Sequence, residues 1–215
     1  MDINNSLVQK KWGSEYLLFR NNKVAIWKLF IKSGEDTSFH CHPNKKTGLI
    51  VLDGAADISF LNNSFTKKGL DKVEIFPGRF HKTQSLSKDG THILEVESPE
   101  DKLDLIRLFD KYGRQGQAYE NNDHYLPLSE ENIRIMEDSL YNINNCWMQI
   151  QTIVEQDEIS FGDFEETYVC LSGGLGHSID KLIVKSGDVI SVSNLKLLLE
   201  HFPPCNIFQF LKIWK

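Results

Sequence analysis

Short apolar stretches separated by turn residues run through the first hundred positions of the chain. They fall at 24–31, 47–52, 56–61, 72–76 and 92–96, with Gly, Asn, Asp or a Pro-Gly pair between them. Strands at such close and even spacing are typical of an antiparallel β-sandwich or barrel rather than of a parallel sheet with helices. We therefore expect an all-β fold.

The middle of the chain interrupts this pattern. Ile133, Met136 and Leu140 share one helical face behind a possible N-cap at Ser129, so the spacing predicts a short helix over 129–141. Strand-like runs return at 147–154, 167–171, 181–184, 188–192 and 207–214. The sequence thus predicts three parts, which are a β domain over 1–118, a linker with a short helix over 119–144, and a smaller β domain over 145–215.

Composition and charge narrow the class of protein. The 215 residues hold 24 Lys and Arg against 30 Asp and Glu, a net charge of −6, and this balance repels phosphate backbones, so no nucleic-acid partner is expected. No apolar run reaches the roughly 18 residues of a membrane helix, and the N-terminal residues do not resemble a signal peptide. The four cysteines form no CxxC pair. We expect a cytoplasmic protein with reduced thiols and no membrane partner.

Three histidines are the residues best placed to carry chemistry. His40 and His42 are two positions apart, so on a strand both side chains lie on one face and Cys41 points to the other. His81 follows a tight Pro-Gly corner. Three imidazoles that converge inside a barrel would bind a borderline divalent cation. The spacing therefore predicts a metal site at His40, His42 and His81 for Zn²⁺, Ni²⁺, Mn²⁺ or Fe²⁺.

The residues around these histidines resemble the two motifs of the cupin family. The first motif, G-x5-H-x-H-x(3,4)-E-x6-G, fits residues 34–54 at both glycines and both histidines, with Thr47 in place of the glutamate. The second, G-x5-P-x-G-x2-H-x3-N, is met at Gly78 and His81, with the proline one residue late and Ser85 in the asparagine position. The resemblance implies a double-stranded β-helix, or jelly-roll, barrel with the metal inside it.

Two further segments are similar to the cupin of type II mannose-6-phosphate isomerases. These are Lys-Trp-Gly-Ser-Glu at 11–15 and a D-x-x-R-x-x-D-x-Y-G-R segment at 104–114. The resemblance implies an isomerase- or epimerase-like reaction on a sugar phosphate or nucleotide sugar, often for surface polysaccharides. Candidate contacts for such a substrate are Lys45, Lys46, Thr47 and Arg79, whereas the charges of the closing segment are more often structural ion pairs.

The loss of the motif glutamate changes the expected chemistry. Three neutral imidazoles leave a bound dication uncompensated, which favours an anionic ligand and weakens metal affinity. Glu95 and Glu97 share one face of a predicted strand, where either would replace the missing ligand or simply face solvent. Isomerisation also needs a base beside a carbonyl group, and the sequence does not identify one.

The second block repeats the first motif only in part. Residues 166–173 match its E-x6-G half, but no histidine pair precedes them. We therefore expect a bicupin whose second cupin is degenerate and binds no metal. Two alternatives to a sugar isomerase stay open, a three-histidine Fe²⁺ dioxygenase and a non-catalytic sugar-binding or regulatory subunit. A homodimer is expected, because cupins often pair through edge strands.

Overall fold

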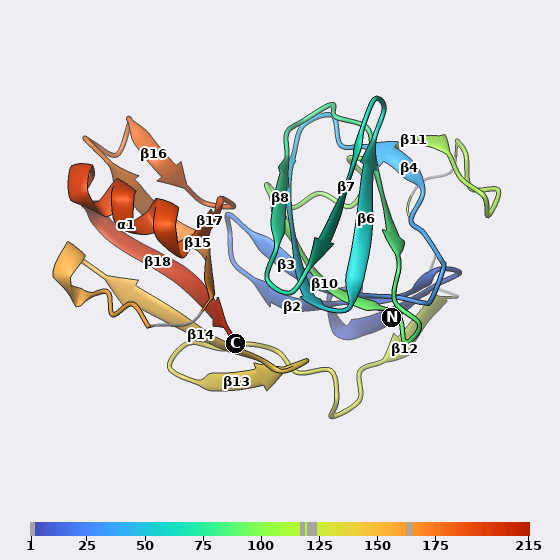
Figure 1. Ribbon diagram of the computed structural model, residues 1–215, viewed down its shortest axis with the longest axis horizontal. Helices are drawn as coiled ribbons and strands as arrows, with labels where there is room; N and C mark the ends of the chain where they lie inside the picture. Colours follow the sequence, from blue (N-terminus) through green and yellow to red (C-terminus); the bar gives the residue numbers. More distant parts are fainter. Residues whose placement is uncertain (1–2, 117–118, 120–123, 163–164) are drawn as a thin grey trace.

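The structure, a computed structural model, describes residues 3–116, 119, 124–162 and 165–215. Antiparallel strands form nearly all of its regular elements, which confirms the predicted all-β class. Three sheets lie one behind another and one helix covers the last of them (Figure 1).

The first twelve strands form two sheets that face each other. The central sheet has the order β12-β1-β2-β3-β10-β5-β8 and the outer sheet the order β11-β4-β9-β6-β7. The central strands are β1 (Ser6–Lys10), β2 (Gly13–Arg20), β3 (Ala25–Ile31), β5 (Lys46–Asp53), β8 (Lys72–Ile75), β10 (Thr91–Ser98) and β12 (Tyr125–Pro127). The outer strands are β4 (Phe39–Cys41), β6 (Ala55–Phe60), β7 (Ser64–Lys68), β9 (His81–Ser85) and β11 (Ile106–Phe109). A 3₁₀ turn, η1 (Ile3–Asn5), precedes β1.

The space between these two sheets is an apolar core. Trp27, Leu49 and Ile93 of the central sheet meet Ile58 and Phe60 of the outer sheet in one buried cluster. Each strand contributes alternate residues to it, as the pleat requires. The two facing antiparallel sheets make the first part of the chain a jelly-roll barrel, the fold class predicted from the sequence.

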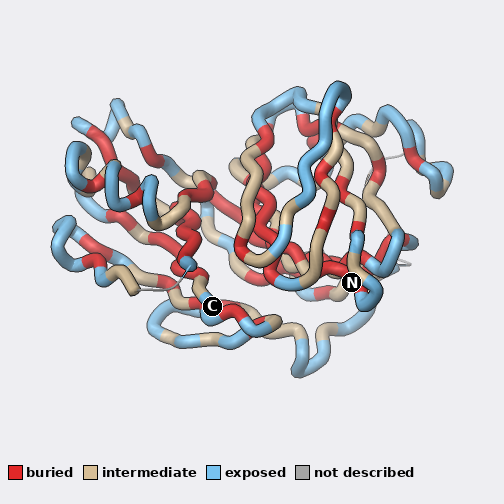
Figure 2. Tube along the Cα trace, viewed as in Figure 1, coloured by how far each residue is buried: buried red, intermediate tan, exposed pale blue. Residues whose placement is uncertain are grey.

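The central sheet is buried on its second face as well. Ile26, Ile50 and Leu94 point away from the barrel and share a core with Met148 and Leu211 of the C-terminal part. Both faces of the central strands are covered, which explains why these strands appear in the sequence as continuous apolar runs. Figure 2 shows the buried segments continuing across this junction.

The C-terminal part is built on a third sheet. Its strands run in the order β13-β14-β18-β15-β16, and β17 pairs with β15. They are β13 (Leu140–Ile143), β14 (Cys146–Ile153), β15 (Glu166–Gly176), β16 (Leu182–Lys185), β17 (Val189–Ser191) and β18 (Pro204–Trp214), with a 3₁₀ turn η3 (Gln156–Glu158) after β14. Helix α1 (Val192–His201) covers the face opposite the central sheet through Leu195 and Leu199.

The second part is thus one sheet between a helix and the first barrel. Within 145–162 and 165–215 no second pair of facing sheets is seen, so a degenerate cupin there stays a prediction, as does the division at 118 and 145. Two strands fall inside the expected linker, where β12 pairs with β1 and β13 pairs with β14.

The helix predicted over 129–141 is wrong, because none of these residues is helical. The Ile135 N–H donates to the Leu18 carbonyl at 3.0 Å, which ties this segment to the central sheet. Ile133 and Ile135 pack against the shared core while Met136 is 67% exposed, so the apolar side chains alternate instead of forming one helical face. Tertiary contacts here override the helical spacing.

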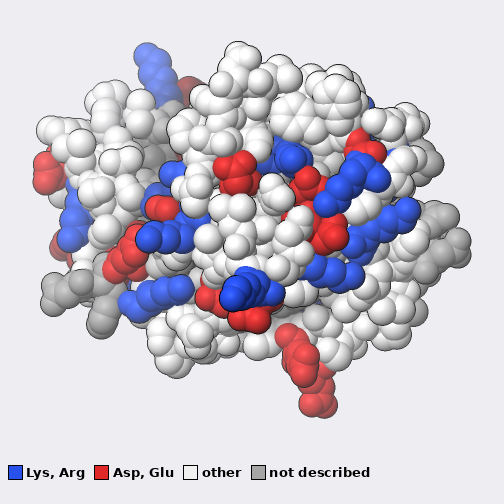
Figure 3. Space-filling model, turned by 45° about the vertical axis from the view of Figure 1, so that its right-hand side comes forward, with Lys and Arg blue, Asp and Glu red and all other residues white. Residues whose placement is uncertain are grey.

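Three observations bear on the other expectations from composition. All four cysteines are free. None of the described helices has the length and apolar character that crossing a bilayer would take. Basic and acidic side chains are interspersed on the face drawn in Figure 3.

Candidate metal centre

His40, His42 and His81 converge on one point inside the barrel. His40 lies on β4 directly opposite His81 on β9, and His42 follows one residue after β4 ends. One ring nitrogen from each lies within 4.8 Å of the others, and the ring centroids are 4.4 to 5.5 Å apart. The two histidines of the HxH pair share a face, as their spacing requires, and Cys41 is buried on the other side.

A tight turn brings the third histidine to the pair. Gly78 has a φ of +76°, a left-handed conformation that favours glycine. Its N–H donates to the His42 carbonyl at 2.8 Å, so the turn is fastened to the strand end that carries the other two ligands. The chain then enters β9 with His81 as its first residue.

Backbone carbonyls fix the orientation of all three rings. His40 Nδ1 lies 2.7 Å from the Ser38 carbonyl, His42 Nδ1 lies 2.6 Å from the Asp104 carbonyl, and His81 Nδ1 lies 3.0 Å from the Arg79 carbonyl. Because a carbonyl only accepts, each Nδ1 must carry the proton, which leaves the Nε2 lone pair of each ring free. This is the arrangement that orients histidines as metal ligands.

Burial keeps the three imidazoles neutral. It lowers the pKa of His42 to about 2, with Lys45 adding to the effect, and it lowers the pKa of His81 to about 4. Burial and the two neighbouring rings hold the pKa of His40 well below its usual value. Neutral rings are the form that binds a cation.

The donor set fits a borderline divalent metal. His42 Nε2 is buried and has no hydrogen-bond partner among the described residues, and an orphaned buried nitrogen is costly unless a ligand takes it. Within the described residues no carboxylate joins the three imidazoles. Thr47, in the motif's glutamate position, is fully buried and its hydroxyl has no described partner.

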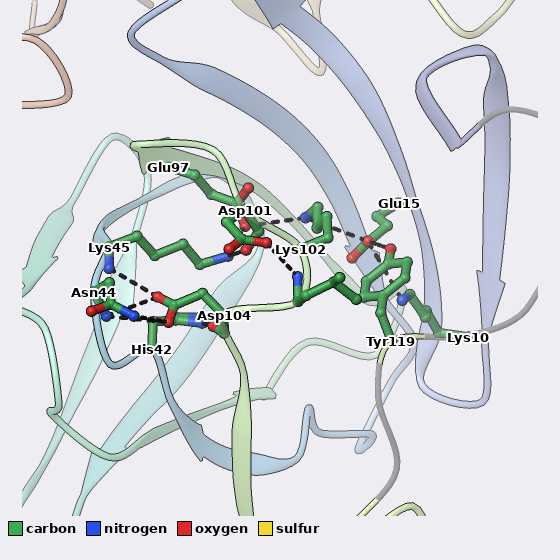
Figure 4. A network of polar contacts seen from close by, with 11 residues as sticks. Lys10, Glu15, His42, Asn44, Lys45, Glu97, Asp101, Lys102, Asp104 and Tyr119 are labelled. Atoms are coloured by element: carbon green, nitrogen blue, oxygen red, sulfur yellow. Dashed lines mark hydrogen bonds and ion pairs between the residues drawn. The ribbon is translucent and has the colours of Figure 1, made fainter.

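A network of buried charges lies beside the histidines (Figure 4). Lys45 donates to Glu97 at 2.6 Å, and Lys102 reaches Glu97 at 3.2 Å and Glu15 at 3.6 Å. Glu15 also pairs with Lys10 at 3.5 Å. Burial would raise the pKa of Glu15, but Lys10 and Lys102 lower it to about 2, so this carboxylate is ionised.

Asp104 links this network to the metal centre. Its carboxylate accepts from the backbone N–H groups of Asn44 and Lys45, both at 2.9 Å, and its own carbonyl accepts from His42. Asp104, the first residue of the closing segment noted in the sequence, therefore orients His42, a candidate metal ligand. Further along that segment, Arg114 makes an ion pair with Asp110 at 2.8 Å.

A small pocket of about 70 Å³ opens beside His40 and His42. It is lined by charged side chains of both signs, namely Lys10, Glu15, Lys45, Glu95, Glu97, Lys102, Arg107 and Arg114. The three histidines were predicted from the sequence as candidate metal ligands, but the place of Glu15 and Lys102 in the pocket lining was not predicted. An isolated charge within an apolar strand pattern, as at Glu15, is the signal that would have found them.

The four predicted substrate contacts lie in different places. Lys45 lines the pocket but is 2% exposed and paired with Glu97. Lys46 forms ion pairs with Glu74 and with Asp188 of the C-terminal part, and it lines a separate cleft. Arg79 is exposed and stacks 4.0 Å from the Phe60 ring. Substrate binding by Lys45, Lys46, Thr47 and Arg79 stays a prediction.

The second block holds no comparable site among its described residues. Glu166, in the repeated half-motif, is buried and bonded to Lys212 at 2.8 Å and to the Tyr168 hydroxyl. Its carboxylate is therefore part of the C-terminal core.

The fold and the three histidines define a jelly-roll barrel with a candidate metal centre. No protein-family model matches the chain, and neither does any curated protein. Among solved structures it is similar to KdgF from Halomonas sp., at 13% identity and a TM-score of 0.41, over 43% of this chain and 84% of that one. It is also similar to an RmlC-like cupin from Shewanella frigidimarina, at 15% identity and a TM-score of 0.41, over 46% and 86%. An uncharacterized double-stranded β-helix protein from Klebsiella pneumoniae shares 16% identity at a TM-score of 0.40, over 42% and 75%.

Proposed function

We propose that the protein is a metal-dependent cupin that acts on a small anionic sugar, such as a sugar phosphate, in an isomerase-like reaction. The observation that carries this proposal is the set of three Nδ1–H···O=C bonds, which leaves an Nε2 lone pair on each of three rings whose ligand nitrogens lie within 4.8 Å of one another. A divalent ion held there would act as a Lewis acid on a carbonyl and its neighbouring hydroxyl.

The charge of the pocket supports an anionic ligand. Five basic side chains and three acidic ones line it, and three neutral imidazoles add nothing to balance a bound dication. The loaded pocket would therefore be positive and would attract phosphate or carboxylate groups.

The size of the pocket favours a small ligand over a nucleotide sugar. A volume of about 70 Å³ has room for only a handful of waters. One end of a sugar phosphate fits this space, whereas a nucleotide would have to lie outside it. The expected homodimer and the cytoplasmic location stay predictions.

Metal analysis followed by a substrate screen tests the proposal. Protein purified without chelators or a histidine tag should contain about one divalent ion per chain, and the His40→Ala, His42→Ala and His81→Ala triple variant should contain none. His177→Ala is the matched control, because His177 is exposed and far along the chain in the C-terminal part. Sugar phosphates would then be tested with Zn²⁺, Mn²⁺, Ni²⁺ and Fe²⁺, and the absence of turnover with every metal would contradict the catalytic part.

A three-histidine Fe²⁺ dioxygenase is the second candidate. The observation that favours it is the absence of a carboxylate from the described ligand group, which leaves coordination positions for both substrate and O₂. Oxygen consumption by the Fe²⁺ form would support this reading. Calorimetric binding of a sugar phosphate without any turnover would instead indicate a sugar-binding subunit.

A further inference from the structure

Glu95 is the one acidic side chain of the pocket whose carboxylate has no hydrogen bond or ion pair with the described residues. It lies on β10 between Ile93 and Glu97, which point to the same side of the central sheet, into the barrel. Glu97, two residues away, is held by Lys45 and Lys102. A strand inside an apolar barrel thus carries two glutamates, of which one is bound by lysines and one is left open to the pocket.

The position of Glu95 relates it to the metal ligands. It lines the same pocket as His40 and His42, and it keeps part of its surface there. It does not belong to the group of ligand atoms that lie within 4.8 Å of one another. A ligand that reached the three Nε2 atoms from this pocket would therefore lie beside a free carboxylate.

The surroundings of Glu95 suit it to exchange protons. The charged groups that act on it are Glu97 on its own strand, Glu15 on β2, Lys45 before β5 and Lys102 after β10. The other titratable or charged side chains of the pocket are Lys10, His40, His42, Arg107, Arg114 and Tyr119. Burial raises the pKa of Glu95 to about 7, opposed by Lys102 and Lys45 and assisted by Glu97 and Glu15. A proton-transferring group works best when its pKa lies near the working pH.

We propose that Glu95 transfers the proton during isomerisation of the bound sugar phosphate, an inference that rests on the function proposed above. The carboxylate takes the hydrogen on the hydroxyl-bearing carbon next to the carbonyl as a proton. The electron pair of that C–H bond becomes the C=C bond of an enediolate, and the C=O π pair moves onto the carbonyl oxygen. Glu95 then returns the proton to the neighbouring carbon as the C=C pair forms the new C–H bond. The hydroxyl proton moves to the former carbonyl oxygen, and the oxygen that loses this proton forms the new C=O bond, so no oxidant or reductant is needed.

The experiment compares Glu95→Gln with Glu97→Gln, the same substitution on the same strand face. The probes are dihydroxyacetone phosphate and fructose 6-phosphate in D₂O, and proton NMR follows deuterium entry next to the carbonyl with the metal-loaded protein. Glu95→Gln should slow exchange at least 100-fold and remove the rise of its rate through pH 7. Its metal content should stay within twofold of the wild type.

Thermal melts without metal or ligand supply the readout that does not depend on activity. A carboxylate without a partner gains nothing for the fold when charged, so Glu95→Gln should melt at or above the wild-type temperature at pH 8. Glu97→Gln removes a paired carboxylate and should melt lower.

Each contrary outcome has a distinct meaning. Wild-type exchange that survives Glu95→Gln overturns the role of Glu95 and leaves the proposed function standing. A tenfold loss of metal in Glu95→Gln would make this residue a ligand, and a loss of melting temperature equal to that of Glu97→Gln would make it structural, so both overturn the inference. No exchange by the wild type with any metal overturns the proposed function and the inference together.

Discussion

The pair of Lys45 and Glu97 offers the sharpest test of how the pocket is held together. Their side chains are 2% and 1% exposed, and they are 2.6 Å apart. Breaking a buried pair by removing one partner typically costs about 3–5 kcal/mol, because the other charge is left uncompensated. Lys102 still reaches Glu97 at 3.2 Å, so we expect Lys45→Met to cost about 3 kcal/mol, at the lower end of that range.

Urea denaturation measures this cost. With a slope of about 2–3 kcal/mol per molar urea for a chain of this size, the midpoint should fall by roughly 1–1.5 M. The double variant Lys45→Met/Glu97→Gln should recover part of the loss, since it removes the stranded charge as well. Arg20→Met is the control, because Arg20 is 48% exposed in its pair with Glu100 and should cost less than about 1 kcal/mol.

A small effect would refute this reasoning. If Lys45→Met costs less than about 1 kcal/mol, or if the double variant loses as much as the two single variants added, the pair does not stabilise the pocket. A variant that kept its stability but lost affinity for sugar phosphates would make Lys45 a ligand contact, as the sequence predicts.

Three further predictions concern pH, metal and the junction between the two parts. The pKa of Glu15 is lowered in the folded protein to about 2, so the stability that this carboxylate contributes is present above its pKa in the unfolded chain and is lost as pH falls toward 2. Glu15→Gln should therefore flatten the decline of melting temperature between pH 5 and pH 3. An unchanged decline would contradict the ion pairs of Glu15 drawn in Figure 4. Zinc at 100 times its dissociation constant should raise the free energy of unfolding by about 2.7 kcal/mol, which corresponds to a rise of roughly 5–10 °C in melting temperature. His42→Ala should abolish this rise, and the control His177→Ala should retain it. A Cβ on Gly48 would lie 2.4 Å from Val189 Cγ2, so Gly48→Ala should lower the free energy of unfolding by about 1–3 kcal/mol, as measured by urea denaturation. Adding Val189→Ala to the same chain should restore part of this loss. Equal stability of the wild type and Gly48→Ala would mean that the two parts are not packed as described.

The first barrel and the convergence of its three histidines could be predicted from local signals. The spacing of His40 and His42 on a strand is fixed by the pleat, and the Pro-Gly corner before His81 has the backbone conformation that glycine permits. The central strands also fall where the apolar runs lie, for example β10 (Thr91–Ser98) over the run at 92–96. These features depend on residues close together in the sequence.

The rest depends on contacts between distant segments. Nothing local distinguishes the extended path of residues 129–141 from a helix, because the bond from Ile135 to Leu18 decides it. Helix α1 is an exception, because local signals for it were present and were missed. Ser193, Lys196 and Glu200 form an exposed polar face opposite the buried Leu195 and Leu199. The Ser191 hydroxyl accepts from the Asn194 N–H at 3.3 Å as an N-cap. The pairing of Glu97 with Lys45 could not be predicted from the sequence, because the two residues are 52 positions apart.

The central sheet has two different environments on its two faces, and successive residues of β10 alternate between them. Leu94 lies in the core shared with the C-terminal part, and its neighbour Glu95 lies in the pocket. Only the central sheet therefore separates Val169 and Leu211, buried in the C-terminal part, from the pocket beside the three histidines. Loss of packing in that core is therefore expected to shift pocket side chains such as Glu95 through β10, although the C-terminal part contributes none of the three histidines.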